Sequence, residues 1–312
     1  MGMGSMGISV QTGGLLPHWG AADTFRMIRE AGFDGIDWGI DEAWDRTVIQ
    51  QGKFTPCVFE KTLPEVHAYY REQLAEIEKN GLVIFQAHAP FPPYVKGFPE
   101  LTDYAVGIYR QCIRFCDDLG IGRLVIHGVS RALDDPGQTK ETVEKLNLYL
   151  YRSLIPVLRE SRVTVCLENL FTRYGRQIIE GACADPREAA ALMDCLNQEA
   201  GKECFGFCLD TGHLNILGKN QEEYILVLGE RIKAVHLHDN WGDDDRHLAP
   251  YAGNIRWREV IGALRAAGYR GNLNFETHQQ VSLSRVDREM VPVWLRAIRE
   301  TGRVFEGWVC GG

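Results

Sequence analysis

Carboxylate and imidazole side chains follow short apolar runs along this chain at nearly regular intervals. Each run is rich in Val, Ile, Leu and Phe and ends at a potential metal ligand, namely His88, His127, Glu168, Asp210, His236 or Glu276. In one buried cavity these groups would repel one another or lose solvation unless a cation neutralised them. The pattern therefore predicts a divalent metal site wherever the fold brings these side chains together.

Histidine is concentrated at the ends of these runs. Seven of the nine histidines lie at or just past a run end: His88, His127, His213, His236, His238, His247 and His278. A single histidine in such a place is more often a hydrogen-bonded structural residue, but seven of them beside three carboxylates favour a functional site. Mixed carboxylate and imidazole ligands suit Mn²⁺, Co²⁺, Zn²⁺ or Fe²⁺ better than Ca²⁺.

The apolar runs alternate with amphipathic stretches, and this alternation predicts eight strand-then-helix units. The predicted strands are 7–10, 33–40, 83–89, 123–129, 164–169, 205–210, 232–239 and 271–278. The predicted helices are 23–31, 63–80, 101–119, 139–160, 186–200, 221–229, 256–267 and 285–300, with a long loop over 41–61. Eight units in a chain of 312 residues indicate an α/β fold, the (β/α)8 TIM barrel, whose strands all open on one face at their C-terminal ends.

An open doubly wound sheet is the alternative architecture. It would be favoured by a glycine-rich phosphate-binding fingerprint after an early strand. Only Gly13-Gly14 follows the first predicted strand, and no such fingerprint is present.

Composition narrows the class of protein. Hydrophobic residues make up 45% of the chain and no Pro/Ser-rich linker interrupts it, so we expect one domain over 1–312 with a disordered lead-in at 1–6. No apolar run is long enough to span a membrane.

The net charge of −8 and the lack of a basic stripe argue against nucleic acid as a partner. Nine cysteines without a CxxC pair are typical of a reducing cytoplasm.

Four of these motifs resemble the xylose isomerase-like barrel superfamily, which contains sugar isomerases, sugar epimerases and endonuclease IV. The motifs are Leu167–Asn169, Leu209–His213, Val235–Asp239 and Phe275–Thr277. The resemblance to tagatose epimerase-like members implies one divalent ion held by Glu168, Asp210, His236 and Glu276. It also implies that Glu168 and Glu276 transfer the substrate proton and that His213 contacts substrate oxygens. Those epimerases carry Arg six residues after the histidine ligand, where this chain has Gly242, so Arg246 is the candidate replacement.

The resemblance to endonuclease IV is also close. That family binds three zinc ions through nine ligands, and the matching residues are His88, His127, Glu168, Asp210, His213, His236, Asp245, His247 and Glu276. A zinc-dependent phosphodiesterase that cleaves abasic DNA is therefore an alternative. A sugar dehydratase or a C-glycoside lyase would use the same site. A non-enzymatic sugar- or metal-binding barrel is a further alternative, but the presence of both Glu168 and Glu276 argues against it.

Aromatic residues in the predicted loops suit the apolar faces of sugars, and they could equally pack as a lid or stack on bases. We expect Trp19 and Trp241 to contact substrate together with His88, His127, His213 and Arg246. The sequence thus predicts an isomerase or epimerase of a small keto-sugar, sugar phosphate or polyol, acting through a metal-stabilised enediolate. We expect one Mn²⁺, Zn²⁺ or Co²⁺ per chain, or up to three if His88, His127, His213, Asp245 and His247 are also ligands. Aromatic residues at the barrel face would also suit a homo-oligomer.

Overall fold

The computed structural model describes residues 6–135 and 137–311. They fall into two compact units. Unit 1 comprises residues up to Gly39, Tyr70–Gln86 and Cys208 onward, and unit 2 comprises Ile40–Tyr69 and Ala87–Phe207. Residues 1–5 of the expected lead-in lie outside the described residues, whereas Met6 is buried and its N–H donates to Glu306 Oε1 at 2.9 Å.

Eight strands form one sheet in the order β10-β1-β2-β3-β4-β5-β8-β9. Their bounds are β1 Ile8–Gln11, β2 Gly35–Gly39, β3 Val83–His88, β4 Arg123–Val125, β5 Thr164–Glu168, β8 Phe205–Asp210, β9 Ile232–His236 and β10 Leu273–Phe275. The two strands at the ends of this order also meet, because Leu237 N–H donates to the Asn274 carbonyl and Leu237 forms a parallel bridge with Phe275. The order thus closes on itself, which confirms the predicted (β/α)8 barrel and excludes the open sheet.

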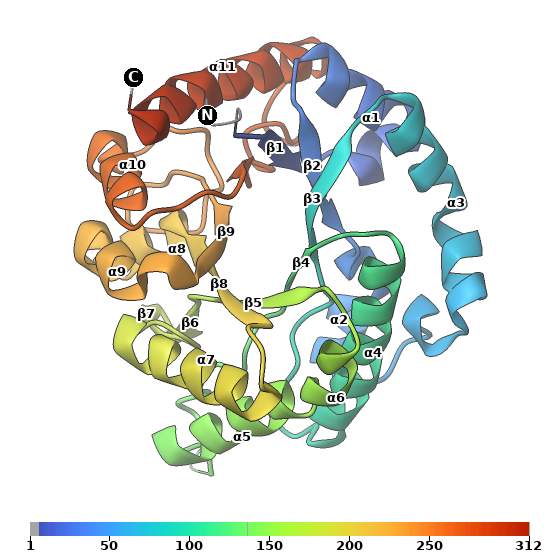
Figure 1. The fold of residues 1–312 in the computed structure, drawn as a ribbon, viewed down its shortest axis with the longest axis vertical. Helices are drawn as coiled ribbons and strands as arrows, with labels where there is room; N and C mark the ends of the chain where they lie inside the picture. The colour runs from blue at the N-terminus through green and yellow to red at the C-terminus, as the bar shows by residue number, and fades with distance from the viewer. Residues whose placement is uncertain (1–5, 136, 312) are drawn as a thin grey trace. The chain divides into compact units, whose positions relative to one another are not determined.

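Helices follow the strands in both units. Those of unit 1 include α1 Leu16–Glu30, α8 Thr211–Ile216, α9 Gln221–Leu228, α10 Trp257–Ala266 and α11 Val291–Cys310. Those of unit 2 include α2 Arg46–Gln50, α4 Glu100–Asp118, α5 Lys140–Arg152, α6 Ile155–Arg159 and α7 Pro186–Ala200, and α3 spans Leu63–Lys79. In unit 1, α10 packs against both α9 and α11, and α11 covers β1 and β10 (Figure 1).

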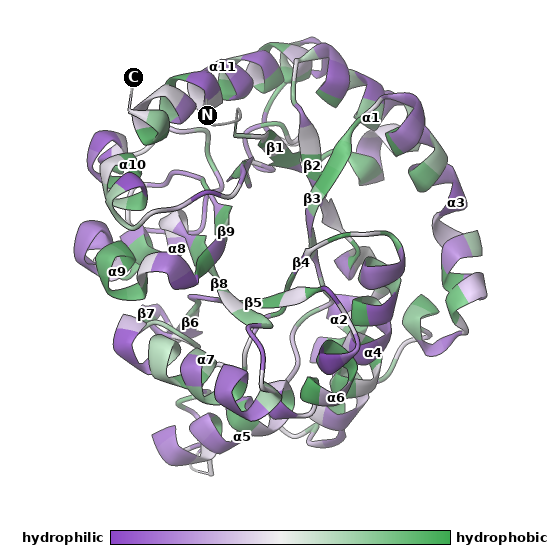
Figure 2. Ribbon diagram, viewed as in Figure 1, coloured by the Kyte–Doolittle hydropathy of each residue, from purple (hydrophilic) through white to green (hydrophobic). Residues whose placement is uncertain are grey.

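The burial pattern follows the expected division of polar and apolar residues. All six residues of β8 are buried, as a strand enclosed on both faces requires. Hydrophobic residues recur along α7 between hydrophilic ones, while β9 is mainly hydrophobic (Figure 2). Among the described residues, no helix is both long enough and apolar enough to cross a membrane.

Three predicted helices have different bounds in the structure. The first begins at Leu16, with Pro17 in its first turn, and is kinked at Gly20, whose φ of 68° and ψ of 175° are not helical. Asp23 therefore lies inside the helical segment after the kink rather than at its N-cap. The stretch 139–160 divides into α5 and α6, since Pro156 cannot continue a helix and begins a new one. The last helix begins at Val291 rather than Arg285, with Pro292 in its first turn, and continues to Cys310.

The structure contains helices and strands that were not predicted. The expected loop 41–61 includes the short helix α2 and two 3-10 turns, Asp41–Ala43 and Val58–Glu60. After β5, the chain forms an antiparallel hairpin of β6 Phe171–Tyr174 and β7 Gln177–Glu180. Directly after β8, the short helix α8 begins at Thr211, and Asp210 caps it by accepting the His213 N–H at 2.7 Å. This cap fixes one oxygen of a predicted metal ligand.

Candidate metal centre

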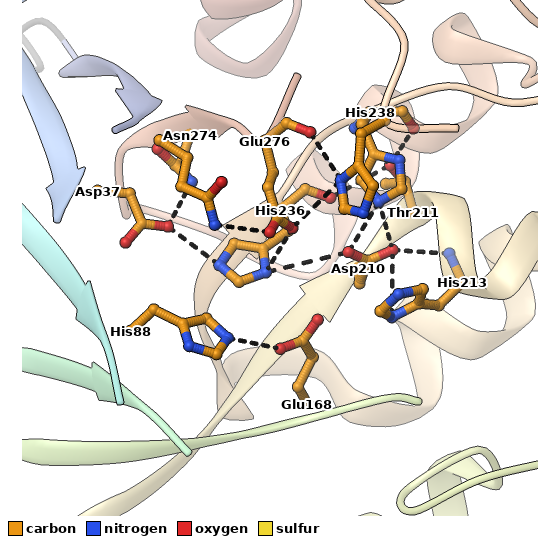
Figure 3. A network of polar contacts seen from close by, with 12 residues as sticks. Asp37, His88, Glu168, Asp210, Thr211, His213, His236, His238, Asn274 and Glu276 are labelled. Atoms are coloured by element: carbon orange, nitrogen blue, oxygen red, sulfur yellow. Dashed lines mark hydrogen bonds and ion pairs between the residues drawn. The ribbon is translucent and has the colours of Figure 1, made fainter. Parts of the chain in front are cut away.

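Unit 1 brings three of the four predicted metal ligands together at strand ends. Asp210 ends β8, His236 ends β9 and Glu276 follows β10 directly. His236 Nδ1 lies 3.1 Å from Glu276 Oε2 and 4.0 Å from Asp210 Oδ2. All three side chains are buried and point toward one another (Figure 3). We call Asp210, His236 and Glu276 the ligand trio.

The chemistry of the ligand trio fits a divalent cation. Two carboxylates beside one imidazole in a nearly dry site would be unfavourable without a compensating positive charge. The same oxygen and nitrogen donors suit Mn²⁺, Co²⁺ or Zn²⁺. The trio is therefore the best-defined candidate for the predicted metal in this unit.

Polar residues around the trio fix its orientation. Gln11, the last residue of β1, donates its Nε2 N–H to Glu276 Oε1 at 2.7 Å. Asp37, inside β2, places Oδ2 at 3.1 Å from His236 Nε2. Neither residue was predicted to belong to the site. For Asp37, the signal available in the sequence was a carboxylate in the middle of an otherwise apolar strand.

A second polar cluster of unit 1 contains His213, His238, Asp245 and His247. Asp245 Oδ2 lies 2.9 Å from His247 Nε2 and 3.5 Å from His213 Nε2. His238 Nε2 approaches both oxygens of Asp210 at 2.9 and 3.0 Å, and its ring stacks on that of His247 at 4.1 Å. The structure thus brings together three residues that the endonuclease IV resemblance implied as ligands, His213, Asp245 and His247, and adds His238.

Local sequence explains why the His238 ring reaches Asp210. A Cβ at Gly212 would collide with the His238 ring, so only glycine permits this approach. Thr211 Oγ1 accepts the N–H of His238 at 3.1 Å and donates to its carbonyl at 2.9 Å. His238 was noticed in the sequence only as one of several histidines, because its role depends on a contact between two strands.

Electrostatics couple Asp245 and His247. Burial opposes the charged form of each group, but their mutual attraction outweighs it. The pKa of Asp245 is lowered by His247 and His213, and the pKa of His247 is raised to about 9 by Asp245, Glu276 and Asp210. The raised pKa of His247 therefore favours its charged form, which offsets part of the negative charge of this cluster.

Unit 2 brings His88, His127 and Glu168 together. His127 Nε2 lies 3.0 Å from Glu168 Oε2 and 3.1 Å from His88 Nε2, while His88 Nε2 is 3.8 Å from Glu168 Oε2 (Figure 3 draws His88 and Glu168). Glu168 ends β5 and is 1% exposed, so its carboxylate depends on these two imidazoles in this unit. Phe91 packs on the His127 ring at 4.4 Å, and the Arg46 guanidinium lies over Phe91.

Three predicted substrate contacts lie in other surroundings. Trp19 is in the first turns of α1, with the Arg288 guanidinium 3.9 Å from its ring centroid. Trp241 is 59% exposed in the loop after β9. Arg246 forms two hydrogen bonds with Asp243 and is half-exposed. Substrate contact by these residues remains a prediction.

The fold and this arrangement of strand-end ligands define the class of protein. Residues 25–298 match the family model described as xylose isomerase-like TIM barrel, and the chain belongs to this family. The resemblance seen in the sequence is thereby confirmed.

Individual relatives include proteins of known and unknown activity. The y4fM protein of Sinorhizobium fredii is 27% identical over 275 residues, covering 83% of this chain and 81% of that protein. D-psicose 3-epimerase of Enterocloster bolteae is 32% identical over 120 residues, which cover 38% of this chain and 35% of that enzyme.

Solved structures agree in fold over almost the whole chain. A D-tagatose 3-epimerase-like protein superimposes with a TM-score of 0.67 at 19% identity, covering 97% of this chain and 98% of that one. The 3-keto-D-glucoside 4-epimerase YcjR of E. coli gives 0.68 at 17% identity, covering 96% and 99%. At such identities the likeness establishes the fold.

Proposed function

We propose that this protein is a divalent-metal-dependent isomerase or epimerase of a small keto-sugar, sugar phosphate or polyol. The observation that carries the proposal is the convergence of Asp210, His236 and Glu276 at the ends of three strands. The substrate class is supported by the epimerases among the relatives and the solved structures.

The ligand trio would hold the ion, with Glu168 as the fourth ligand that the sequence predicts. Bound there, the ion would supply positive charge beside the carbonyl and hydroxyl oxygens of the substrate. The chain's own residues would then bind the sugar and move its proton.

Glu276 and Glu168 are the proposed acid–base pair. Epimerisation requires one group to remove a proton from carbon and a second group to return a proton to the opposite face. Glu276 Oε1 accepts the Gln11 N–H, so Oε2 is the oxygen proposed to exchange the proton. Glu168 Oε2 is held by His127, which is suited to stabilise its charged form between transfers.

His213, His88 and His127 are proposed to orient substrate hydroxyls. Each presents a ring nitrogen beside a carboxylate of the site: Asp245 for His213 and Glu168 for the other two. If further ions bind, the same residues with Asp245 and His247 would hold them.

A zinc phosphodiesterase is the second candidate function. It is favoured by the two extra groupings, His213 with Asp245 and His247, and His88 with His127 and Glu168. Two or three zinc ions per purified chain, together with cleavage of abasic-site DNA, would select this function over the first. About one ion per chain, with no DNA cleavage, would support the sugar enzyme.

Hydrogen exchange in D₂O tests the proposed chemistry whichever sugar is the product. Protein loaded with Mn²⁺, Co²⁺ or Zn²⁺ is incubated with D-psicose, D-tagatose, D-fructose, L-ribulose and inososes, and NMR detects deuterium on carbon and new sugars. We expect exchange with at least one sugar, and its loss by at least 100-fold in Glu276→Gln, in the usual range for removing a general base.

Glu259→Gln is the matched control, because Glu259 is an exposed glutamate of α10. Its exchange rate should equal that of the wild type. Wild-type exchange in Glu276→Gln would contradict the assigned role of Glu276, and no exchange with any sugar or metal would contradict the proposed function.

A further inference from the structure

A buried carboxylate in β2 takes no part in the proton transfer proposed for Glu276 and Glu168. Asp37 lies inside β2 between Ile36 and Trp38, and its side chain is fully buried. Its Oδ2 atom accepts N–H groups from Gln86 Nε2 at 3.0 Å and from Asn274 Nδ2 at 2.9 Å. The same oxygen lies 3.1 Å from His236 Nε2 (Figure 3).

This arrangement is costly for the fold alone. Two neutral amides do not cancel a carboxylate charge, and Asp37 Oδ1 has no hydrogen-bond partner among the described residues. A buried, incompletely paired carboxylate costs several kcal/mol relative to an apolar side chain of similar size.

The contact has a direct consequence for His236. Nε2 of the ring faces Asp37, whereas Nδ1 faces Glu276 Oε2 and Asp210 Oδ2. A neutral imidazole carries one N–H, and a carboxylate accepts but does not donate. With the N–H on Nε2, the lone pair on Nδ1 is directed at the other two members of the ligand trio.

We propose that Asp37 is a positioning residue that sets the tautomer and orientation of His236 for metal binding and strengthens the ion's affinity through its negative charge. The inference rests on the proposed function, in that the ligand trio must bind a divalent ion. Carboxylates that accept the second N–H of a ligating histidine fix the ring and raise its basicity, and their loss typically lowers metal affinity by about 10–100-fold.

Two variants separate the charge of Asp37 from its polar contact with His236. Asp37→Asn keeps the volume and can present an acceptor oxygen to His236, Gln86 and Asn274, but it removes the charge. Asp37→Leu removes both. Asp34→Asn is the matched control. Asp34 directly precedes Gly35, the first residue of β2, and accepts the Ile8 N–H there.

Two measurements are made on metal-free protein. Calorimetric titration with Mn²⁺ gives the dissociation constant, and ¹H–¹⁵N correlation of ¹⁵N-histidine-labelled protein reports which nitrogen of His236 carries hydrogen. We expect Nε2 of His236 to carry hydrogen in the wild type and in Asp34→Asn, with equal Mn²⁺ affinity. We expect about 10-fold weaker binding in Asp37→Asn, and about 100-fold weaker binding with a mixed tautomer in Asp37→Leu.

Each result bears on the inference. Unchanged Mn²⁺ affinity and tautomer in both Asp37 variants would overturn the inference, and so would an equal loss of affinity in Asp34→Asn. If Asp37→Leu does not fold, unchanged affinity and tautomer in Asp37→Asn alone would overturn it. If the wild type itself binds no ion, the proposed function fails. The tautomer spectra then still decide whether Asp37 orients His236.

Discussion

At the scale of single residues, the ligand trio is oriented by contacts that connect distant parts of the sequence. Gln11 at the end of β1 holds one oxygen of Glu276, and Asp37 in β2 contacts the ring of His236. Both contacts are made by the chain's own residues. Such preorganisation lowers the cost of arranging ligands and reacting groups when an ion and a substrate bind.

Gln11→Leu tests this preorganisation. Removal of the 2.7 Å hydrogen bond leaves Glu276 Oε1 without its donor, so the carboxylate should rotate away from the productive position. We expect kcat to fall by about 10-fold with a smaller change in KM, since positioning acts chiefly on the transition state. Steady-state kinetics on the best sugar check this, and an unchanged kcat would show that Gln11 does not position Glu276.

Cys57 gives a pH dependence of stability that is separate from the site. Burial raises the pKa of this thiol from 9.0 to about 11, although a backbone N–H at Phe59 works in the opposite direction. Between these values the unfolded chain has lost the proton that the folded chain keeps, so the free energy of unfolding should decrease as pH rises from 9 to 11. The slope from this one group approaches about 1.4 kcal/mol per pH unit.

Urea unfolding of wild type and Cys57→Ala at several pH values measures this contribution. The difference in stability between the two proteins should be constant from pH 6 to 8 and should shrink above pH 9. A constant difference throughout would mean that the Cys57 thiol ionises equally in both states.

At the scale of elements, helix caps set boundaries without taking part in the chemistry. Asp185 caps α7 of unit 2 by accepting the N–H groups of Arg187 and Glu188 at 2.8 and 3.0 Å, and Gly201 ends the helix with a φ of 72°. Pro186 fits the first turn, where its missing N–H is not needed. These signals explain why the predicted bounds of this helix, 186–200, agree with the structure.

Asp185→Ala should therefore lower stability by about 1 kcal/mol, because two N–H groups lose their acceptor. Gln198→Ala, an exposed change near the end of the same helix, should cost much less. Chemical denaturation measures both. Mn²⁺ affinity should be unchanged in each variant, and a loss of affinity in Asp185→Ala would show that the cap also supports the site.

At the scale of the whole molecule, the proposed ion would couple ligand binding to stability. An ion that binds only the folded chain adds about 2.7 kcal/mol at a concentration 100 times its dissociation constant. Chelator should therefore lower the melting temperature by several °C, and added Mn²⁺ or Co²⁺ should restore it.

Glu276→Gln provides the comparison for this prediction. Its melting temperature should respond less to chelator and to added metal, because one charged member of the ligand trio is lost. A melting temperature of the wild type that is the same with and without chelator would argue against a resident ion.

The sequence alone determined the strands, most helices and the identity of the strand-end ligands. All eight predicted strands overlap observed ones, because apolar runs, caps and glycine stops act over a few neighbouring residues. The sequence did not predict the hairpin after β5, the division of 139–160 or the early start of α1. In these segments either packing outweighs the local preference for secondary structure, or the outcome depends on where a proline falls within a helical turn.

Only the tertiary structure decided how the side chains meet. The hydrogen bond from Asn274 to Asp37 connects residues 237 positions apart, and the contacts of His238 with Asp210 and His247 also depend on how strand ends are placed within the sheet. No local pattern specifies such pairs, because strand order and register set them. The ligand types were therefore visible in the sequence, whereas the contacts of Asp37 and His238 depend on how the strands are arranged in the sheet.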